Sequence, residues 1–277
     1  MKYINSSMTL LRNYGSAVKI AVAFLFFTSF SLRSVAQEDE PLKNFRFGLR
    51  VSPEISWLKP NDTKKLEGAG AKLKMGYALM TEFRLNKVVS LATGIGFEKN
   101  GGSLNYTDTA RYLYYDDAPL TIKSDTSGIS NKTEAYQLKK RNFSIAYWTI
   151  PITLKMRTKE IGVMTYFGQA GINLGIRTKG VAKDDVLSSK NSSTSLDDIN
   201  ISSDMSIFKA AINVGAGAEY NLAGSTSLVV SINYLNGLTN VSKSKSEYLY
   251  KTEGTSRTAY KQKFTNNAVS LTVGVLF

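Results

Sequence analysis

The chain ends with NNAVSLTVGVLF, residues 266–277, and this stretch decides the fold because its apolar residues recur at every second position. The apolar residues are Val269, Leu271, Val273, Val275 and Phe277, and Ser270, Thr272, Gly274 and Leu276 stand between them. Successive side chains of a β-strand point to opposite faces, so a period of two predicts a strand with one apolar face. Such a strand needs neighbours on both edges and an apolar environment on one face.

The same alternation recurs in seven earlier segments, which makes eight candidate strands. They lie near 45–57, 73–85, 89–98, 143–156, 166–177, 208–222, 228–234 and 266–277. Three of the connections are short, near 86–87, 157–162 and 223–226, and four are long, near 58–72, 99–141, 178–206 and 240–263. This layout is typical of an up-and-down barrel in an outer membrane. The sequence therefore predicts an all-β fold, an eight-stranded antiparallel transmembrane β-barrel with short periplasmic turns and long extracellular loops.

The polar faces of these segments combine small residues with charges, which assigns them to the barrel interior and the apolar faces to lipid. Eight strands enclose a bore that side chains just fill. We expect acids and bases there to pair in a buried ionic network, because an unpaired charge would be very costly. The candidate lumen residues are Arg46, Arg50, Glu54, Lys74, Glu82, Arg84, Glu98, Lys155, Arg177, Lys209 and Glu219. A proton or ion path is the functional alternative for the same residues.

One segment, NFSIAYWTIPITLKM (142–156), changes its alternation between Tyr147 and Trp148. An extra residue would produce this change, so the sequence predicts a β-bulge close to Pro151, which lacks a ladder donor. We also expect aromatic residues to form girdles at the two membrane interfaces. These residues are Phe45, Phe83 and Phe277 at the short-turn end, and Trp57, Phe97, Phe143, Phe208 and Phe264 at the long-loop end.

The first 36 residues have the features of a secretory signal peptide. Cations precede an apolar run at 20–27, and Ser34 and Ala36 stand at the −3 and −1 positions of a cleavage site. The run is short for a membrane-spanning helix, which needs about 20 residues. We expect a signal peptide over 1–36, a short periplasmic segment over 37–43 and the barrel domain over 44–277, exported to the outer membrane of a Gram-negative bacterium.

The composition excludes several kinds of chemistry. The formal charge of +13 loses four cations and no acid with the signal peptide, and the remaining +9 favours contact with anionic headgroups over nucleic acid. The chain has no cysteine and no histidine, which removes disulfides, the usual general base and the commonest zinc ligand. The paired acids Asp116–Asp117 and Asp197–Asp198 lack the spacing of a calcium loop. We therefore expect no enzyme activity, no cofactor and no metal site, with a surface enzyme as the rival class.

Several stretches resemble the PorT-like family of small outer-membrane β-barrels of Bacteroidota. They are FRFGLRVSPEISW from residue 45, YWTIPITLKM (147–156), VGAGAEY (214–220) and YLNGLTNV (234–241), and the resemblance extends over the mature chain. It implies the same barrel fold and, through one member, a role in a type IX secretion system. The final strand, with Val273, Val275 and Phe277, resembles the assembly signal that the outer-membrane insertion machinery reads.

The long loops hold the remaining candidates for function. Tyr112, Tyr114 and Tyr115 in RYLYYDD (111–117) either contact a partner or pack across the barrel mouth, and the last loop is basic enough to contact anionic lipopolysaccharide. We expect a monomer in outer-membrane lipid with a structural or binding role carried by these loops. The alternative is an accessory role in protein secretion, which would bring an extracellular or secretion-system protein as partner.

Overall fold

The computed structural model describes residues 44–115, 118–122, 134–188, 192–253 and 256–277. The chain divides into two units, 1–42 and 43–277, and the described residues belong to the second. The expected signal peptide, the segment 37–43 and the pair Asp116–Asp117 lie outside the described residues. Within the described ranges, no helix has the length and apolar character needed to cross a membrane.

Eight long antiparallel strands form a closed ring. They are β1 (Phe45–Pro60), β3 (Lys72–Arg84), β4 (Val89–Tyr106), β7 (Glu134–Arg157), β8 (Met164–Ser188), β10 (Phe208–Ala223), β11 (Thr226–Gly237) and β14 (Phe264–Leu276). Each strand pairs with the next of this series, and β14 returns to pair with β1. The prediction of an eight-stranded up-and-down barrel is therefore confirmed.

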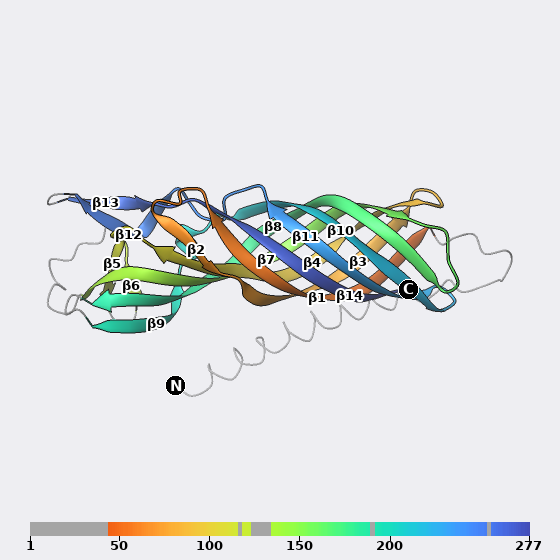
Figure 1. The fold of residues 1–277 in the computed structure, drawn as a ribbon, viewed down its shortest axis with the longest axis horizontal. Coiled ribbons are helices and arrows are strands. Elements are labelled where there is room, and N and C mark those ends of the chain that lie inside the picture. Colours follow the sequence, from red (N-terminus) through yellow and green to blue (C-terminus); the bar gives the residue numbers. More distant parts are fainter. Residues whose placement is uncertain (1–43, 116–117, 123–133, 189–191, 254–255) are drawn as a thin grey trace, which may run out of the picture. The chain divides into compact units, whose positions relative to one another are not determined.

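Short turns join the ring strands at one end, the turn end, and long connections join them at the other, the loop end (Figure 1). The long connections carry β2 (Leu66–Gly70), β5 (Arg111–Tyr115), β6 (Ala118–Leu120), β9 (Ser193–Asn200), a 3-10 helix (Ser202–Asp204), β12 (Lys245–Glu253) and β13 (Ser256–Lys261). Strand β2 pairs with β4, β9 with β8 and β5 with both β7 and β12. These segments, predicted as loops, instead continue the sheet past the rim of the ring, and we call this part the extension.

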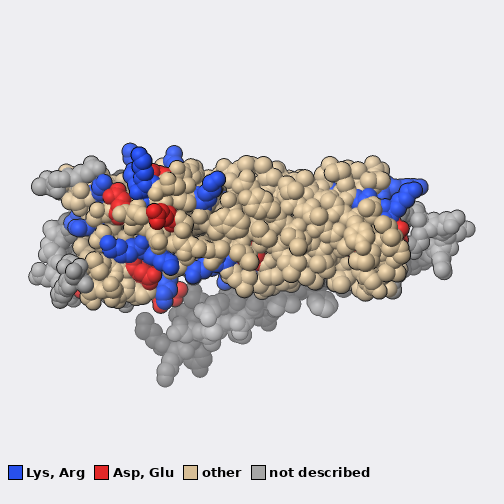
Figure 2. All heavy atoms as spheres, in the orientation of Figure 1, with Lys and Arg blue, Asp and Glu red and all other residues tan. Residues whose placement is uncertain are grey.

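The outer surface of the ring is apolar over the middle of the strands and charged towards both ends (Figure 2). Large apolar side chains stand exposed on it, such as Leu79 at 55%, Trp148 at 53% and Ile232 at 63%. Soluble monomers rarely expose contiguous apolar surface on this scale, whereas a barrel in a membrane needs an outward apolar band about 25 Å tall. The apolar faces of the strands therefore point to lipid, as the sequence predicted.

Strand β7 keeps a single phase through the segment whose alternation changes in the sequence. Its odd-numbered residues face the interior from Phe143 to Arg157, so β7 does not carry the predicted extra residue, although the register between β7 and β8 does shift between Ala146 and Tyr147. The extra residue near this height is Thr178 on the neighbour β8, because Ala146 pairs with Lys179 and Tyr147 with Arg177.

The sequence pattern changes on β7 because the surroundings of the strand change. In the membrane the outer face meets lipid, so apolar side chains point outward and polar ones inward. Beyond the membrane the outer face meets water, and burial of apolar surface then favours the interior. Leu58 on β1 and Leu104 on β4 mark the same inversion, since both are interior and nearly fully buried, while Lys59 next to Leu58 and Lys99 on the outer face of β4 are exposed.

The inversion corrects the predicted girdle at the loop end. Phe143 and Phe264 do not face lipid; they pack against each other inside the barrel, with ring centroids 5.0 Å apart. The outward aromatic pairs at this end are Trp57 with Tyr234 and Phe97 with Trp148, and Phe208 is 69% exposed.

The terminal strand is held on both edges. Its Phe277 N–H donates to the carbonyl of Phe47 at 2.7 Å, and the two rings lie 5.6 Å apart at the turn end. Gly48 on β1 stands directly against Val275, where a Cβ would collide with the carbonyl oxygen. The close pairing of first and last strands therefore requires glycine at this position.

Candidate functional site

Five charged side chains fill the lumen near the turn end, and we call them the lower lumen cluster. They are Arg46, Glu82, Lys155, Arg157 and Glu219, all buried. They come from β1, β3, β7 and β10, whose interior positions face one another across the bore. Three cations thus surround two carboxylates.

Each carboxylate of the lower lumen cluster contacts all three cations. Arg46 Nη2 lies 3.0 Å from Glu82 and 2.9 Å from Glu219. Lys155 Nζ lies 3.3 Å from Glu82 and contacts Glu219. Arg157 contacts Glu82 and lies 3.7 Å from Glu219. Mutual pairing offsets the large cost of removing these charges from water.

An apolar group lies beside the lower lumen cluster and helps to close the bore. The Lys155 ammonium sits 3.9 Å from the centroid of the Phe167 ring. Phe167 packs in turn with Val229, Leu276 and the partly buried Met80. The turn end of the lumen is therefore filled by charged and apolar side chains together.

A second polar group, the upper lumen cluster, lies further towards the loop end and consists of Arg50, Glu54, Glu98, Asn100 and Lys209. Arg50 Nη2 lies 3.7 Å from Glu98 Oε1. The Asn100 amide donates to Glu54 and accepts from the Lys209 ammonium, so it bridges opposite charges. Neutral amides thus complete the pairing where the acids and bases do not meet directly.

The other predicted lumen residues lie at the margins of the two clusters. Lys74 donates to Ser144 at 3.1 Å, Arg177 donates to the Ser206 carbonyl at 3.3 Å, and Arg84 is half-buried near the turn end. The sequence reasoning missed Arg157, which it assigned to a turn. The alternation that includes Lys155 would have found it, because residue 157 lies two positions further on the same face.

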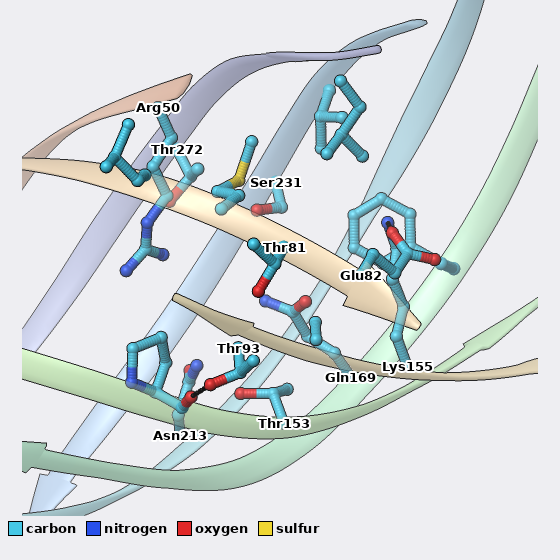
Figure 3. A pocket seen from close by; sticks show the side chains of 17 residues that line it. Arg50, Thr81, Glu82, Thr93, Thr153, Lys155, Gln169, Asn213, Ser231 and Thr272 are labelled. Atoms are coloured by element: carbon cyan, nitrogen blue, oxygen red, sulfur yellow. Dashed lines mark hydrogen bonds and ion pairs between the residues drawn. The ribbon is translucent and has the colours of Figure 1, made fainter. Parts of the chain in front are cut away.

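Small cavities separate the polar side chains of the lumen. One of about 60 Å³ lies among Thr81, Thr153, Gln169 and their neighbours, whose side chains point into the bore from facing strands (Figure 3). Another of about 10 Å³ lies between the acids of the upper lumen cluster. Arg50 lines both cavities. A cavity needs roughly 10–15 Å³ to hold one water, so these spaces admit a few waters and no hydrated ion.

We expect the protein to give no steady channel current in a planar bilayer. Its conductance should be at least about tenfold below that of a 16-stranded porin in the same membrane, because eight strands leave a bore that side chains fill. Single-channel recording measures this, with the porin as positive control and the folded state checked by heat-modifiable gel migration. A steady ohmic current from folded protein would contradict the filled lumen.

Beyond the upper lumen cluster the interior becomes the apolar core of the extension. Its members come from ring strands and long connections alike; they include Leu58, Leu66, Leu104, Phe143, Ile145, Tyr147, Ile201, Met205, Leu249 and Phe264. One ion pair is enclosed beside this core, between Arg141 on β7 and Asp184 on β8. Arg141 Nε donates to Asp184 Oδ1 at 2.7 Å, and Nη2 donates to the other carboxylate oxygen. This bidentate geometry gives the strongest kind of ion pair between an arginine and a carboxylate.

The electrostatics of this pair favour the charged state. Burial works to lower the pKa of Arg141, but the Asp184 charge and its hydrogen bonds outweigh burial and raise it. Burial also raises the pKa of the neighbouring Tyr112 hydroxyl, which therefore stays neutral. The Arg141 guanidinium lies 5.9 Å from the centroid of the Tyr112 ring.

A buried carboxylate ties two of the long connections together. Asp204, at the end of the 3-10 helix, accepts hydrogen bonds from the Ser246 hydroxyl and from the Glu247 N–H at 2.6 Å. Burial raises the pKa of Asp204, although these hydrogen bonds act in the opposite direction. The connection between β8 and β10 is thereby fixed to the start of β12.

The predicted tyrosines of the longest connection differ in their exposure. Tyr112 is fully buried and packs with Tyr136, at a centroid distance of 6.1 Å, so its ring is not offered to a partner. Tyr114 is partly buried and lies 5.9 Å from the same ring. The Tyr115 backbone pairs with Ala118, and its side chain lies outside the described residues.

Acidic residues do not gather into a metal site in the described part of the chain. Among those residues no group of three or more acids could hold a metal ion. Asp197 is exposed and lies 3.0 Å from the Lys183 ammonium. Asp198 is exposed too and has a positive φ of 53°.

Comparison with solved structures returns outer-membrane proteins at low similarity. Neisserial surface protein A has 11% identity and a TM-score of 0.39, over 86% of this chain and 98% of its own. Ail of Yersinia pestis has 14% identity and a TM-score of 0.33, over 84% and 98%. OprG of Pseudomonas aeruginosa has 9% identity and a TM-score of 0.41, over 84% and 95%. No curated protein matches the chain.

A family model gives the firmer assignment. The model described as outer membrane protein beta-barrel domain matches residues 35–243, which is well over half of the chain. It agrees with the closed ring of eight strands and the outward apolar belt. The protein therefore belongs to the outer membrane protein beta-barrel domain family, whose members are proteins of the Gram-negative outer membrane.

Proposed function

We propose that this protein is a non-enzymatic outer-membrane barrel whose work is a binding role carried by the extension. The observation that supports the proposal is the division of the molecule into two parts with different interiors. The membrane part is filled by the two lumen clusters, and the two cavities found among its described residues hold about 60 and 10 Å³. The extension instead has an apolar core like that of a soluble protein and a surface rich in charges (Figure 2). A rigid platform outside the membrane suits recognition better than transport.

The resemblance to the PorT-like family supports a second candidate, an accessory role in a type IX-like secretion system. This second candidate rests on the sequence motifs alone. The binding role and the secretion role differ in the side of the membrane on which the partner would bind. A secretion accessory would engage machinery at the turn end, in the periplasm, whereas a surface binder would engage molecules at the extension. A surface enzyme has the least support, since a protein without histidine lacks the usual general base.

Site-specific photo-cross-linking in intact cells tests the proposal. A cross-linker at Thr258, exposed on β13, should capture cell-surface components, and the same group at Lys159, exposed in the turn before β8, should capture few. Both positions are exposed, and they differ in the side of the membrane. Cross-links to secretion proteins from Lys159 alone would contradict the surface-binding role and favour the secretion role.

A further inference from the structure

A hollow of about 480 Å³ opens on the extension, and we call it the lysine pocket. The residues that matter in its lining are Lys65, Lys245, Lys251, Lys261, Asp108 and Thr258. They come from the residue before β2, the segment after β4 and both strands of the β12–β13 hairpin. The volume lies within the range of small-molecule sites, about 300–1,000 Å³.

The charges in the lysine pocket are only partly balanced by the protein. Lys251 Nζ lies 3.3 Å from Asp108, and Lys65 Nζ lies 3.5 Å from Asp62. A hydrogen bond from the Thr109 N–H and the contact with Lys251 lower the pKa of Asp108, so this carboxylate is ionised near neutral pH. Lys245 and Lys261 form no ion pair with any other described residue, which leaves two uncompensated ammonium groups.

The two lysines that carry them stand directly opposite each other in the hairpin. Lys245 on β12 and Lys261 on β13 are Cα partners in the antiparallel register, so their side chains leave the same face of the hairpin. Cβ atoms of such partners lie about 4.5–5.5 Å apart, and like charges in this position destabilise a sheet. An anion bound between them would remove the repulsion and turn it into attraction.

The backbone of β13 adds donors to the same space. The Tyr260 side chain does not, because it is 3% exposed and packs in the apolar core against Tyr106, with ring centroids 5.8 Å apart. Strand β13 ends the sheet order, and four consecutive residues, 258–261, line the pocket, as expected where a strand edge with no neighbour among the described strands runs along it. Backbone N–H groups on such an edge are available to anionic oxygens.

The height of the pocket above the membrane selects among anionic ligands. Towards the loop end, the last outward apolar residue on β14 is Val269, and Lys261 lies eight positions earlier in the chain. At about 3.3 Å per residue and a tilt of about 40°, this places Lys261 roughly 20 Å above the hydrocarbon edge. The headgroup layer is only about 5–8 Å thick. Lipid headgroup phosphates therefore lie too low, and anionic groups on sugars reach the pocket.

We infer that the lysine pocket binds a saccharide that carries phosphate or sulfate groups, with Lys245 and Lys261 holding one anionic group between them. The pocket is larger than a single anion and is lined by charged and hydroxyl groups, which suits a sugar better than an acyl chain. The inference deepens the proposed function and rests on it, because it names the class of ligand that the extension would recognise.

Calorimetric titration of the folded protein in detergent with a sulfated disaccharide tests the inference. The unsulfated parent disaccharide should bind at least about tenfold more weakly, and inorganic phosphate should compete. The double substitution Lys245→Glu with Lys261→Glu should weaken binding of the sulfated disaccharide at least about tenfold, and Lys245→Arg with Lys261→Arg should preserve it.

The matched control reverses two exposed lysines in the periplasmic turns, Lys87→Glu with Lys159→Glu, and so changes the net charge equally. Three outcomes would each overturn the inference. The two double charge reversals could weaken binding equally, the sulfated disaccharide could fail to bind, or the protein could bind only to vesicles with phosphorylated headgroups. Heat-modifiable migration shows that every variant is folded. Cross-links from Thr258 without saccharide binding would refute this inference alone, whereas the loss of both would refute the proposed function as well.

Discussion

Replacing Glu219 by Gln is expected to lower the free energy of unfolding by about 3–5 kcal/mol, the usual cost of breaking a buried ion pair by removing one partner. Glu219 contacts Arg46, Lys155 and Arg157 in the lower lumen cluster. The substitution leaves Glu82 as the sole acid facing three buried cations. Urea unfolding in phospholipid vesicles, extrapolated to zero urea, measures the change.

Two further variants make the result specific to charge balance. Glu67→Gln, on an exposed position of β2, should change stability by no more than about 0.5 kcal/mol. Adding Lys155→Met to Glu219→Gln removes one cation with the acid and should recover part of the loss, since the remaining charges balance better. If Glu219→Gln behaved like Glu67→Gln, the lumen charges would have to be solvated individually by water rather than paired.

Replacing Phe264 by Ala should destabilise the extension by about 3–5 kcal/mol, as for other buried phenylalanines. The ring is fully buried in the apolar core and packs on Phe143. The cavity left by the missing ring lies beyond the membrane part. The loss of stability should therefore appear first as tryptic cleavage at the many lysines and arginines of the extension. The ring strands in the membrane should stay resistant.

Phe208→Ala is the matched control for this prediction. The same side chain is removed, but Phe208 is 69% exposed on the outer face of β10. It leaves no enclosed cavity, so the loss should be well below that of Phe264→Ala and should not expose the extension to trypsin. The sequence placed both rings in one girdle, which predicts equal effects. Equal losses would therefore contradict the inverted interior.

The sequence predicted the ring because its information is local and repeated. A period of two assigns each residue to a face, and the sorting of short and long connections by end fixes the topology. The size and charge of the polar face then indicate which face is inside, as Arg46 and Glu82 illustrate by meeting in the lumen. None of these arguments needs to know which strands lie opposite each other.

The extension escaped sequence reasoning for two physical reasons. Most of its strands are short, so a single buried residue such as Leu66 or Leu249 gives no period to detect. Alternation also does not report which solvent lies on each side of a strand. From Phe143 to Arg157 on β7 the interior stays on one face while lipid gives way to water, and the apparent change of phase at Trp148 reflects this transition rather than an extra residue on β7. The partners in the lumen could not be predicted either, since they join strands distant in sequence.

The shared core of the extension constrains the order of assembly. It brings together Leu58 from the first ring strand, Phe264 from the last and Leu249 from the hairpin between β11 and β14. These residues can meet only once the two chain-distant strands have come together. The extension is thus the last part of the protein to fold. Its resistance to protease therefore reports that insertion into the bilayer is complete.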